Sequence, residues 1–194
     1  MAKNKFDFVA VSIWAEFYID KFSRPERYTK FNSGQSNPTY LVETSQKKYV
    51  LRKKPEGKLL KSAHAVDREY RVQLALQNTE VPVPRMAMFC SDLSILGTEF
   101  YIMDHIEGTC FEDPRLNIFA KDHRYSIFEE MSNILAEIHK VDLLKVGLSD
   151  YGPSGEYFTR QITRWTKQYR SSETGQIKSM DQLILWLEEN IPVD

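Results

Sequence analysis

The feature that most constrains the fold is a pair of short extended segments, Thr39–Thr44 and Lys48–Lys53, separated by a polar turn at Ser45-Gln46. The segments contain β-branched and aromatic residues, which favour strands, and the turn residues between them are polar. Strand, tight turn and strand are typical of a hairpin. The sequence therefore predicts an antiparallel hairpin in the first third of the chain.

A polar loop, residues 32–38, precedes this hairpin. Gly34 provides a position at which the backbone can approach a ligand closely, and Ser36 and Asn37 add short polar side chains. Backbone N–H groups of such a loop can hold phosphate oxygens. A loop with a single glycine is also typical of a plain turn, so the loop alone does not decide between the two interpretations.

The strand Lys48–Lys53 carries a second candidate feature. Side-chain alternation places Val50 and Arg52 on one face, so a cation lies beside a small apolar residue. This combination suits the phosphates and the base of a nucleotide. For the neighbouring lysines, Lys47, Lys48, Lys53 and Lys54, we expect the charges that protect an edge strand.

Residues 62–77 predict a helix that presents an isolated carboxylate. Asp67 precedes Arg71 by four residues, which is the spacing of an ordinary surface ion pair. Glu69 has no cation three or four residues away and lies beside the apolar stripe. A carboxylate near a core is tolerated when it is paired, and Arg52 is the natural partner. The alternative is an exposed, unpaired Glu69.

Two further strands, residues 86–89 and 99–103, follow a proline-rich stretch and are separated by a turn at Leu96-Gly97. The chain then becomes polar over residues 104–108. A short connection of this kind joins a sheet lobe to a helical lobe, although other loops have the same composition.

The remaining segments predict helices. An amphipathic helix over residues 6–15 precedes the sheet, and another ends near His139. Two more helices are expected at residues 154–170 and 179–190, and the second carries Leu183, Trp186 and Leu187 along one face. We expect this apolar stripe to stay partly exposed or to be covered by another chain, because large apolar patches seldom face water.

Four segments together resemble the aminoglycoside phosphotransferase family, and most closely the kinase-like region fused to acyl-CoA dehydrogenases: residues 34–40, 49–60, 63–70 and 100–108. The resemblance implies an α+β fold. Residues 1–104 would form a protein-kinase-like small lobe, an antiparallel sheet with one packed helix and an N-terminal helix. Residues 105–194 would form the hinge and the first helices of an incomplete helical large lobe.

The resemblance also implies a role for individual residues in binding ATP. The loop residues Gly34, Gln35, Ser36 and Asn37 would cover the phosphates. Arg52 would replace the usual strand lysine, with Glu69 as its helix partner. The backbone of Met103, Asp104, His105 and Ile106 would contact adenine, above the floor formed by Val50. Arginine at the lysine position departs from protein kinases, and it changes the expected phosphate geometry.

Phosphoryl transfer in this family needs a His-x-Asp loop and magnesium held by an aspartate and an asparagine. None of the four histidines, His64, His105, His123 and His139, has an aspartate two residues later. We therefore expect no catalytic residue and no metal ligand in this chain, with magnesium bound only if a missing half is supplied. The chain would be a nucleotide-binding half that is inactive alone. The alternative is a non-catalytic scaffold or partner-binding pseudokinase module.

Composition is typical of a folded domain, with 42% hydrophobic and 27% charged residues and a net charge of −1. Residues 47–71 hold nine cations, but only Tyr49 and Tyr70 interleave with them, so nucleic acid is not an expected partner. No apolar run approaches the roughly 18 residues of a membrane span. Cys90 and Cys110 give no disulfide framework, which favours an intracellular location. Expected partners are a nucleotide and, through the apolar stripe, a second copy or the missing half.

Overall fold

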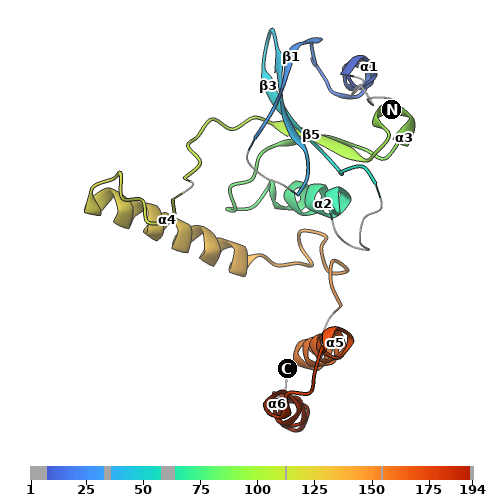
Figure 1. Cartoon of the computed structure of the whole chain (residues 1–194). Helices are drawn as coiled ribbons and strands as arrows, with labels where there is room; N and C mark the ends of the chain where they lie inside the picture. Colours follow the sequence, from blue (N-terminus) through green and yellow to red (C-terminus); the bar gives the residue numbers. More distant parts are fainter. Residues whose placement is uncertain (1–7, 33–35, 58–63, 112, 154, 193–194) are drawn as a thin grey trace. The chain divides into compact units, whose positions relative to one another are not determined.

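The computed structural model describes residues 8–32, 36–57, 64–111, 113–153 and 155–192 (Figure 1). The chain divides into two compact units, residues 1–148 and 149–194. The predicted lobe boundary after residue 104 falls inside the first unit and stays a prediction.

A five-stranded antiparallel sheet forms the centre of the first unit, with the strand order β1-β2-β3-β5-β4. The predicted hairpin is confirmed as β2 (Thr39–Thr44) and β3 (Lys48–Lys53). Strands β4 (Met86–Cys90) and β5 (Phe100–Asp104) correspond to the other two predicted strands. Sequence analysis gave no bounds for β1 (Pro25–Lys30), whose charged sequence carries little strand signal. The predicted α+β class is confirmed.

The position of β3 corrects the interpretation of the lysines around it. The strand pairs with β2 on one side and β5 on the other, so it is central and needs no protective edge charges. Lys53 is 4% exposed, and its Nζ donates to Glu56 Oε1 at 3.0 Å. Lys47 and Lys54 form ion pairs with Asp104 and Glu99, and Lys48 is exposed. Sequence analysis was wrong about Lys53 because neighbouring charges hid the strand's central place.

Helices cover both faces of the sheet (Figure 1). Helix α1 (Phe8–Tyr18) packs Val11 and Ala15 against side chains of one face, including Leu51. Its outer side is apolar too, with Ile13 and Phe17 59% and 80% exposed, so the predicted amphipathic character is wrong. Burying small apolar side chains against the sheet is enough to hold this helix, because each removes apolar surface from water.

Helix α2 (Val66–Leu76) covers the opposite face, where Val66 packs with Met86 and Tyr101. Between β4 and β5, the predicted turn is the end of a short helix, α3 (Leu93–Leu96). Gly97 closes it with φ of 71°, and its N–H donates to Leu93 O at 2.7 Å. Glycine suits this left-handed position because it lacks a Cβ.

Three longer helices follow the sheet: α4 (Lys121–Lys140), α5 (Tyr157–Ser172) and α6 (Lys178–Glu189). They confirm the predicted helices to within a few residues at the ends. Most apolar side chains of α4 are exposed in the described part of the chain, with Met131 at 59% and Leu135 at 53%, while Ile127 and Ile134 are half-buried. Helices α5 and α6 pack on each other and form the second unit.

Candidate nucleotide site

The predicted ion pair between Arg52 and Glu69 is present. Arg52 Nε donates to Glu69 Oε2 at 2.7 Å, and Arg52 Nη2 approaches Oε1 at 3.4 Å. Strand β3 supplies the cation and the first turn of α2 supplies the carboxylate. Both side chains are about one-third exposed or less, at 27% and 33%. Burial by itself would lower the pKa of Arg52, but the hydrogen bond and charge of Glu69 raise it above its ordinary value.

Glu69 is the centre of a larger hydrogen-bond network. Asn37 Nδ2 donates to Glu69 Oε1 at 2.8 Å, and the Tyr101 hydroxyl donates to Oε2 at 3.1 Å. Asn37 Oδ1 lies 2.9 Å from His64 Nδ1, which fixes the orientation of the amide. The carboxylate therefore links the loop before β2 with β3, β5 and α2.

Asn37 has a different place from the one predicted. Its side chain is buried, with the residue 3% exposed, and both amide atoms are engaged with Glu69 and His64. The side chain therefore positions the loop, and only the backbone of Asn37 remains for a phosphate contact. Ser36 is exposed. Gly34 and Gln35 lie outside the described residues.

The face of the sheet beside Arg52 is largely apolar. Pairing in register places Val50 opposite Leu41 and Met103, and Arg52 opposite Thr39 and Tyr101. Side chains at paired positions lie on the same face, so Val50 and Met103 form a floor next to the cation. Val50 is 7% exposed. An apolar floor is therefore present beside Arg52, and its use by a base stays a prediction.

Thr39 on β2 and Gln73 on α2 add further hydrogen bonds to the network around Arg52 and Glu69. Arg52 Nη1 donates to Thr39 Oγ1 at 3.0 Å, and Gln73 Nε2 donates to the Tyr101 hydroxyl at 3.3 Å. Burial, reinforced by the charge of Glu69, raises the pKa of Tyr101 to about 12. Tyr101 is thus a neutral hydroxyl donor to Glu69 at physiological pH.

The predicted hinge follows directly from β5. The Asp104 N–H donates to Arg85 O at 2.8 Å, and the His105 N–H donates to Lys48 O at 3.3 Å. Both amides are therefore occupied by the sheet. Ile106 is 66% exposed, and in the described part of the chain its N–H has no hydrogen-bond acceptor. Of the predicted adenine contacts, Ile106 is the one that keeps a free donor.

Sequence analysis missed four members of the network: Thr39, His64, Gln73 and Tyr101. The register of the predicted hairpin already places Thr39 opposite Arg52, so this residue could have been found. Tyr101 could not, because the pairing between β3 and β5 spans some 50 residues of sequence and carries no local signal. His64 is not helical. It has φ of 59° and precedes α2, in a position that no helical pattern identifies.

The described residues contain no group of three or more His, Cys, Asp or Glu side chains arranged to hold a metal ion. No helix in this part of the chain combines the length and apolar character needed to cross a bilayer. The donors that the site offers among the described residues, the Arg52 guanidinium and the Ile106 N–H, fit an anionic ligand and not a bare divalent cation.

Comparison with known families agrees with this geometry. The model described as "Phosphotransferase enzyme family" matches residues 27–194. The chain belongs to this phosphotransferase family. A solved neighbour, assigned as an aminoglycoside phosphotransferase from Ralstonia eutropha, superposes with a TM-score of 0.83 and 42% sequence identity. The match covers 97% of this chain and 54% of that one.

Two curated relatives of this phosphotransferase chain are much longer proteins. Acyl-CoA dehydrogenase family member 10 of Mus musculus is 45% identical over 168 residues, which are 87% of this chain and 16% of the relative. Acyl-CoA dehydrogenase family member 11 of Rattus norvegicus is 39% identical over 196 residues, or 99% of this chain and 25% of the relative. The chain thus spans a quarter or less of either relative. The resemblance to both families is confirmed.

Proposed function

We propose that this chain is the nucleotide-binding part of an ATP-dependent small-molecule phosphotransferase and does not transfer phosphate alone. The observation that carries the proposal is the pair formed by Arg52 and Glu69, 2.7 Å apart, beside the floor of Val50 and Met103. A strand cation paired with a helix carboxylate is the arrangement that kinases use to hold nucleotide phosphates. Family membership supports this use of the pair.

Arg52 keeps donors for a ligand while it is held by the protein. Its Nε, Nη1 and Nη2 each donate one hydrogen bond to Glu69 or Thr39. Each terminal nitrogen retains a second N–H, and a guanidinium is charged at every physiological pH. Arg52 can therefore contact phosphate oxygens without giving up Glu69. The loop at residues 34–37 would add backbone donors.

Catalysis would require groups that this sequence does not supply. None of its histidines begins a His-x-Asp loop, and the described residues hold no cluster of metal ligands. Positioning and charge neutralisation by magnesium dominate phosphoryl transfer, so a site without base and metal ligands should be inactive. We propose that the remaining part of a large lobe, in the same chain or another, completes the site and holds magnesium.

Calorimetric titration with a non-hydrolysable ATP analogue tests the nucleotide proposal. We expect saturable binding to the wild-type chain. Arg52→Ala should weaken it at least about tenfold, because charge-assisted hydrogen bonds contribute roughly 1.5–3 kcal/mol. Arg27→Ala is the matched control, since Arg27 lies on β1 with a 72% exposed side chain and a long 4.0 Å contact to Glu43.

Circular dichroism would show that each variant is folded before its affinity is compared. No saturable binding to the wild-type chain, or equal affinity in Arg52→Ala and wild type, would contradict the proposal. Addition of a hydroxyl acceptor to the chain with ATP and magnesium should give no phosphorylated product; turnover would refute the inactive-alone part and leave nucleotide binding intact.

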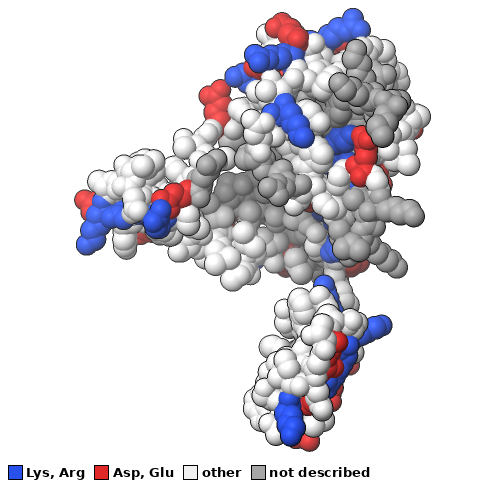
Figure 2. All heavy atoms as spheres, viewed as in Figure 1, with Lys and Arg blue, Asp and Glu red and all other residues white. Residues whose placement is uncertain are grey.

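A second candidate, a partner-binding scaffold, is favoured by the second unit. An apolar groove of about 320 Å³ lies between α5 and α6, lined by Trp165, Leu183 and Ile184 among others. Leu183 and Trp186 are 46% and 57% exposed. Figure 2 shows this unit with a broad uncharged surface on one side and mixed charge on the other. A second copy or the remaining large lobe would cover it.

Sedimentation velocity over a hundredfold concentration range separates the scaffold from the nucleotide-binding proposal. A self-associating scaffold would show a rising sedimentation coefficient that Trp186→Ser abolishes. A monomer at every concentration would contradict self-association. We also propose an intracellular location, supported by two cysteines that are both free thiols.

A further inference from the structure

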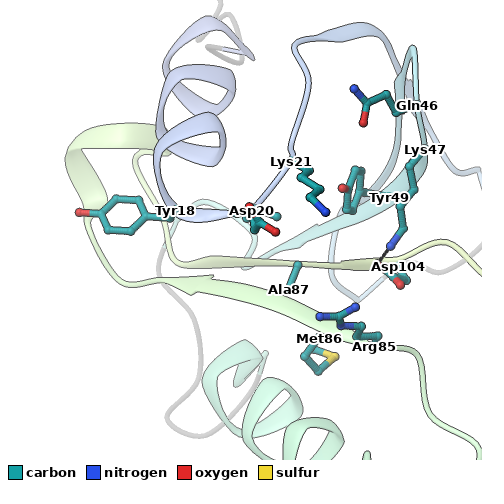
Figure 3. Close-up of a pocket in the computed structure, with 11 residues that line it drawn as sticks. Tyr18, Asp20, Lys21, Gln46, Lys47, Tyr49, Arg85, Met86, Ala87 and Asp104 are labelled. Atoms are coloured by element: carbon teal, nitrogen blue, oxygen red, sulfur yellow. Dashed lines mark ion pairs between the residues drawn. The ribbon is translucent and has the colours of Figure 1, made fainter.

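A second cavity lies on the opposite face of the sheet from Arg52. It has a volume of about 440 Å³, within the range of small-molecule sites. It is lined by the end of α1 and the residues after it, by the turn before β3 and the start of β3, by the start of β4 and by the end of β5 (Figure 3). Tyr49 faces this cavity while its neighbour Val50 faces the nucleotide site, so the two sites are separated by the thickness of the sheet.

Positive charge dominates the polar part of this cavity. Lys21, Lys47 and Arg85 line it, against Asp20 and Asp104. Lys47 Nζ and Asp104 Oδ1 are 2.6 Å apart and neutralise each other, as the dashed line in Figure 3 marks. In the described part of the chain, neither Lys21 nor Arg85 forms an ion pair. Two cations therefore remain, opposed by Asp20 alone.

Lys21 projects into the cavity, and the floor of the cavity favours a ligand with an apolar body. Lys21 has φ of 57°, a left-handed conformation that non-glycine residues seldom adopt, and Figure 3 shows its side chain projecting into the space beside Tyr49. The floor is formed by Ile19, Tyr49 and Ala87. Ile19 and Tyr49 are 8% and 5% exposed, and Ala87 packs against the same side-chain cluster. Such a floor is already desolvated and can take an aromatic or aliphatic group at little cost.

We propose that this cavity is a binding site for a small organic anion, in which a carboxylate or phosphate lies between Lys21 and Arg85 and a compact apolar body lies on Tyr49 and Ala87. Two unpaired cations favour the anionic group, because Asp104 is already satisfied by Lys47. The site is separate from the network of Arg52 and Glu69, to which none of its residues belongs. Asp104 of the predicted hinge lines it as well, through the carboxylate that pairs with Lys47.

Calorimetry with phenyl phosphate and with benzoate tests the site, and the two probes distinguish a phosphate from a carboxylate ligand. Benzyl alcohol is the neutral control. We expect saturable binding of at least one anion in 150 mM salt and none of the alcohol. Lys21→Gln and Arg85→Gln should each weaken binding by about tenfold, the loss of one charge-assisted contact. Lys30→Gln removes an exposed cation on β1, outside the cavity, and should leave affinity within about twofold.

Arg52→Ala separates this proposal from the nucleotide site. Affinity for the anion should be unchanged in Arg52→Ala, although this variant binds the ATP analogue at least about tenfold more weakly. Three results would overturn the proposal. The first is no saturable binding of either anion, and the second is that Lys30→Gln weakens binding as much as Lys21→Gln does. The third is that Arg52→Ala loses anion binding while Lys21→Gln binds the anion as tightly as wild type. The last result would place the anion at the nucleotide site instead.

Discussion

Truncation of Glu69 to alanine should destabilise the first unit more than the removal of an ordinary carboxylate. The carboxylate accepts hydrogen bonds from Arg52, Asn37 and Tyr101 at 2.7, 2.8 and 3.1 Å. Its removal leaves the Asn37 amide, in a residue only 3% exposed, with an unsatisfied donor, and a buried unsatisfied donor costs roughly 1–3 kcal/mol.

The Arg52 contribution is smaller than a buried ion pair would give. Both side chains are about 30% exposed, so water can replace part of the lost contact, and exposed pairs contribute about 0.2–1 kcal/mol. Together with the Asn37 and Tyr101 donors, we expect Glu69→Ala to lower the free energy of unfolding by about 2–4 kcal/mol. Asp67→Ala is the control, because Asp67 is an exposed carboxylate in the first turn of the same helix and shares its dipole term.

Urea unfolding followed by the fluorescence of Trp14 would measure the loss. The Trp14 ring lies 5.1 Å from Phe100 in the first unit. Trp165 and Trp186 belong to the second unit, so replacement of both by Phe leaves Trp14 as the reporter. A double-mutant cycle with Arg52→Met should give a coupling energy of about 0.5–3 kcal/mol. A loss no larger than that of Asp67→Ala, with no coupling to Arg52, would refute the reasoning.

Two further predictions concern titrating side chains. The pKa of Tyr101 is raised by burial to about 12 from its ordinary value of 10.0, so its contribution to stability is complete below pH 10 and is lost as the pH rises toward 12. Between pH 10 and pH 12, the free energy of unfolding measured in urea should therefore fall by about 2–3 kcal/mol more in wild type than in Tyr101→Phe. An identical decline in both proteins would contradict the assigned pKa. For the thiols, Cys110 is exposed, whereas Cys90 is 2% exposed and burial raises its pKa. Ellman's reagent should modify Cys110 at least about tenfold faster than Cys90 in the native protein. The fast phase should be absent from Cys110→Ser, and the two thiols should react at equal rates in urea. A fast phase that remains in Cys110→Ser would contradict this assignment.

Much of the candidate site could be predicted from the sequence because its two charged members stood out locally. Arg52 alternates with an apolar residue on a clear strand, and Glu69 has no cation at helical spacing, so pairing the two required only that charges near a core find partners. The roles of Met103 to Ile106 rested on resemblance, and the sheet hydrogen bonds of Asp104 and His105 now leave Ile106 as the free amide donor among them.

Other features needed the assembled sheet. The same sequence pattern that predicted β3 also suggested an edge strand, and only pairing with β5 showed that Lys53 is buried. Asn37 looked like a phosphate donor because short polar residues in a loop usually face outward. Its amide instead lies between His64 and Glu69, contacts that join segments 27 and 32 residues away.

By itself, the sequence determined most of the elements and the family of this protein: local periodicity set four of the strands and the longer helices, and ordered motifs identified the phosphotransferase family. Only the tertiary structure decided which polar groups meet, because strand register and the packing of α2 on the sheet bring together residues that no local pattern connects. The cavity proposed to bind a small organic anion likewise depends on the tertiary structure. Its cations come from the segment after α1, the turn before β3 and the residue before β4, and they lie together only once the chain has folded.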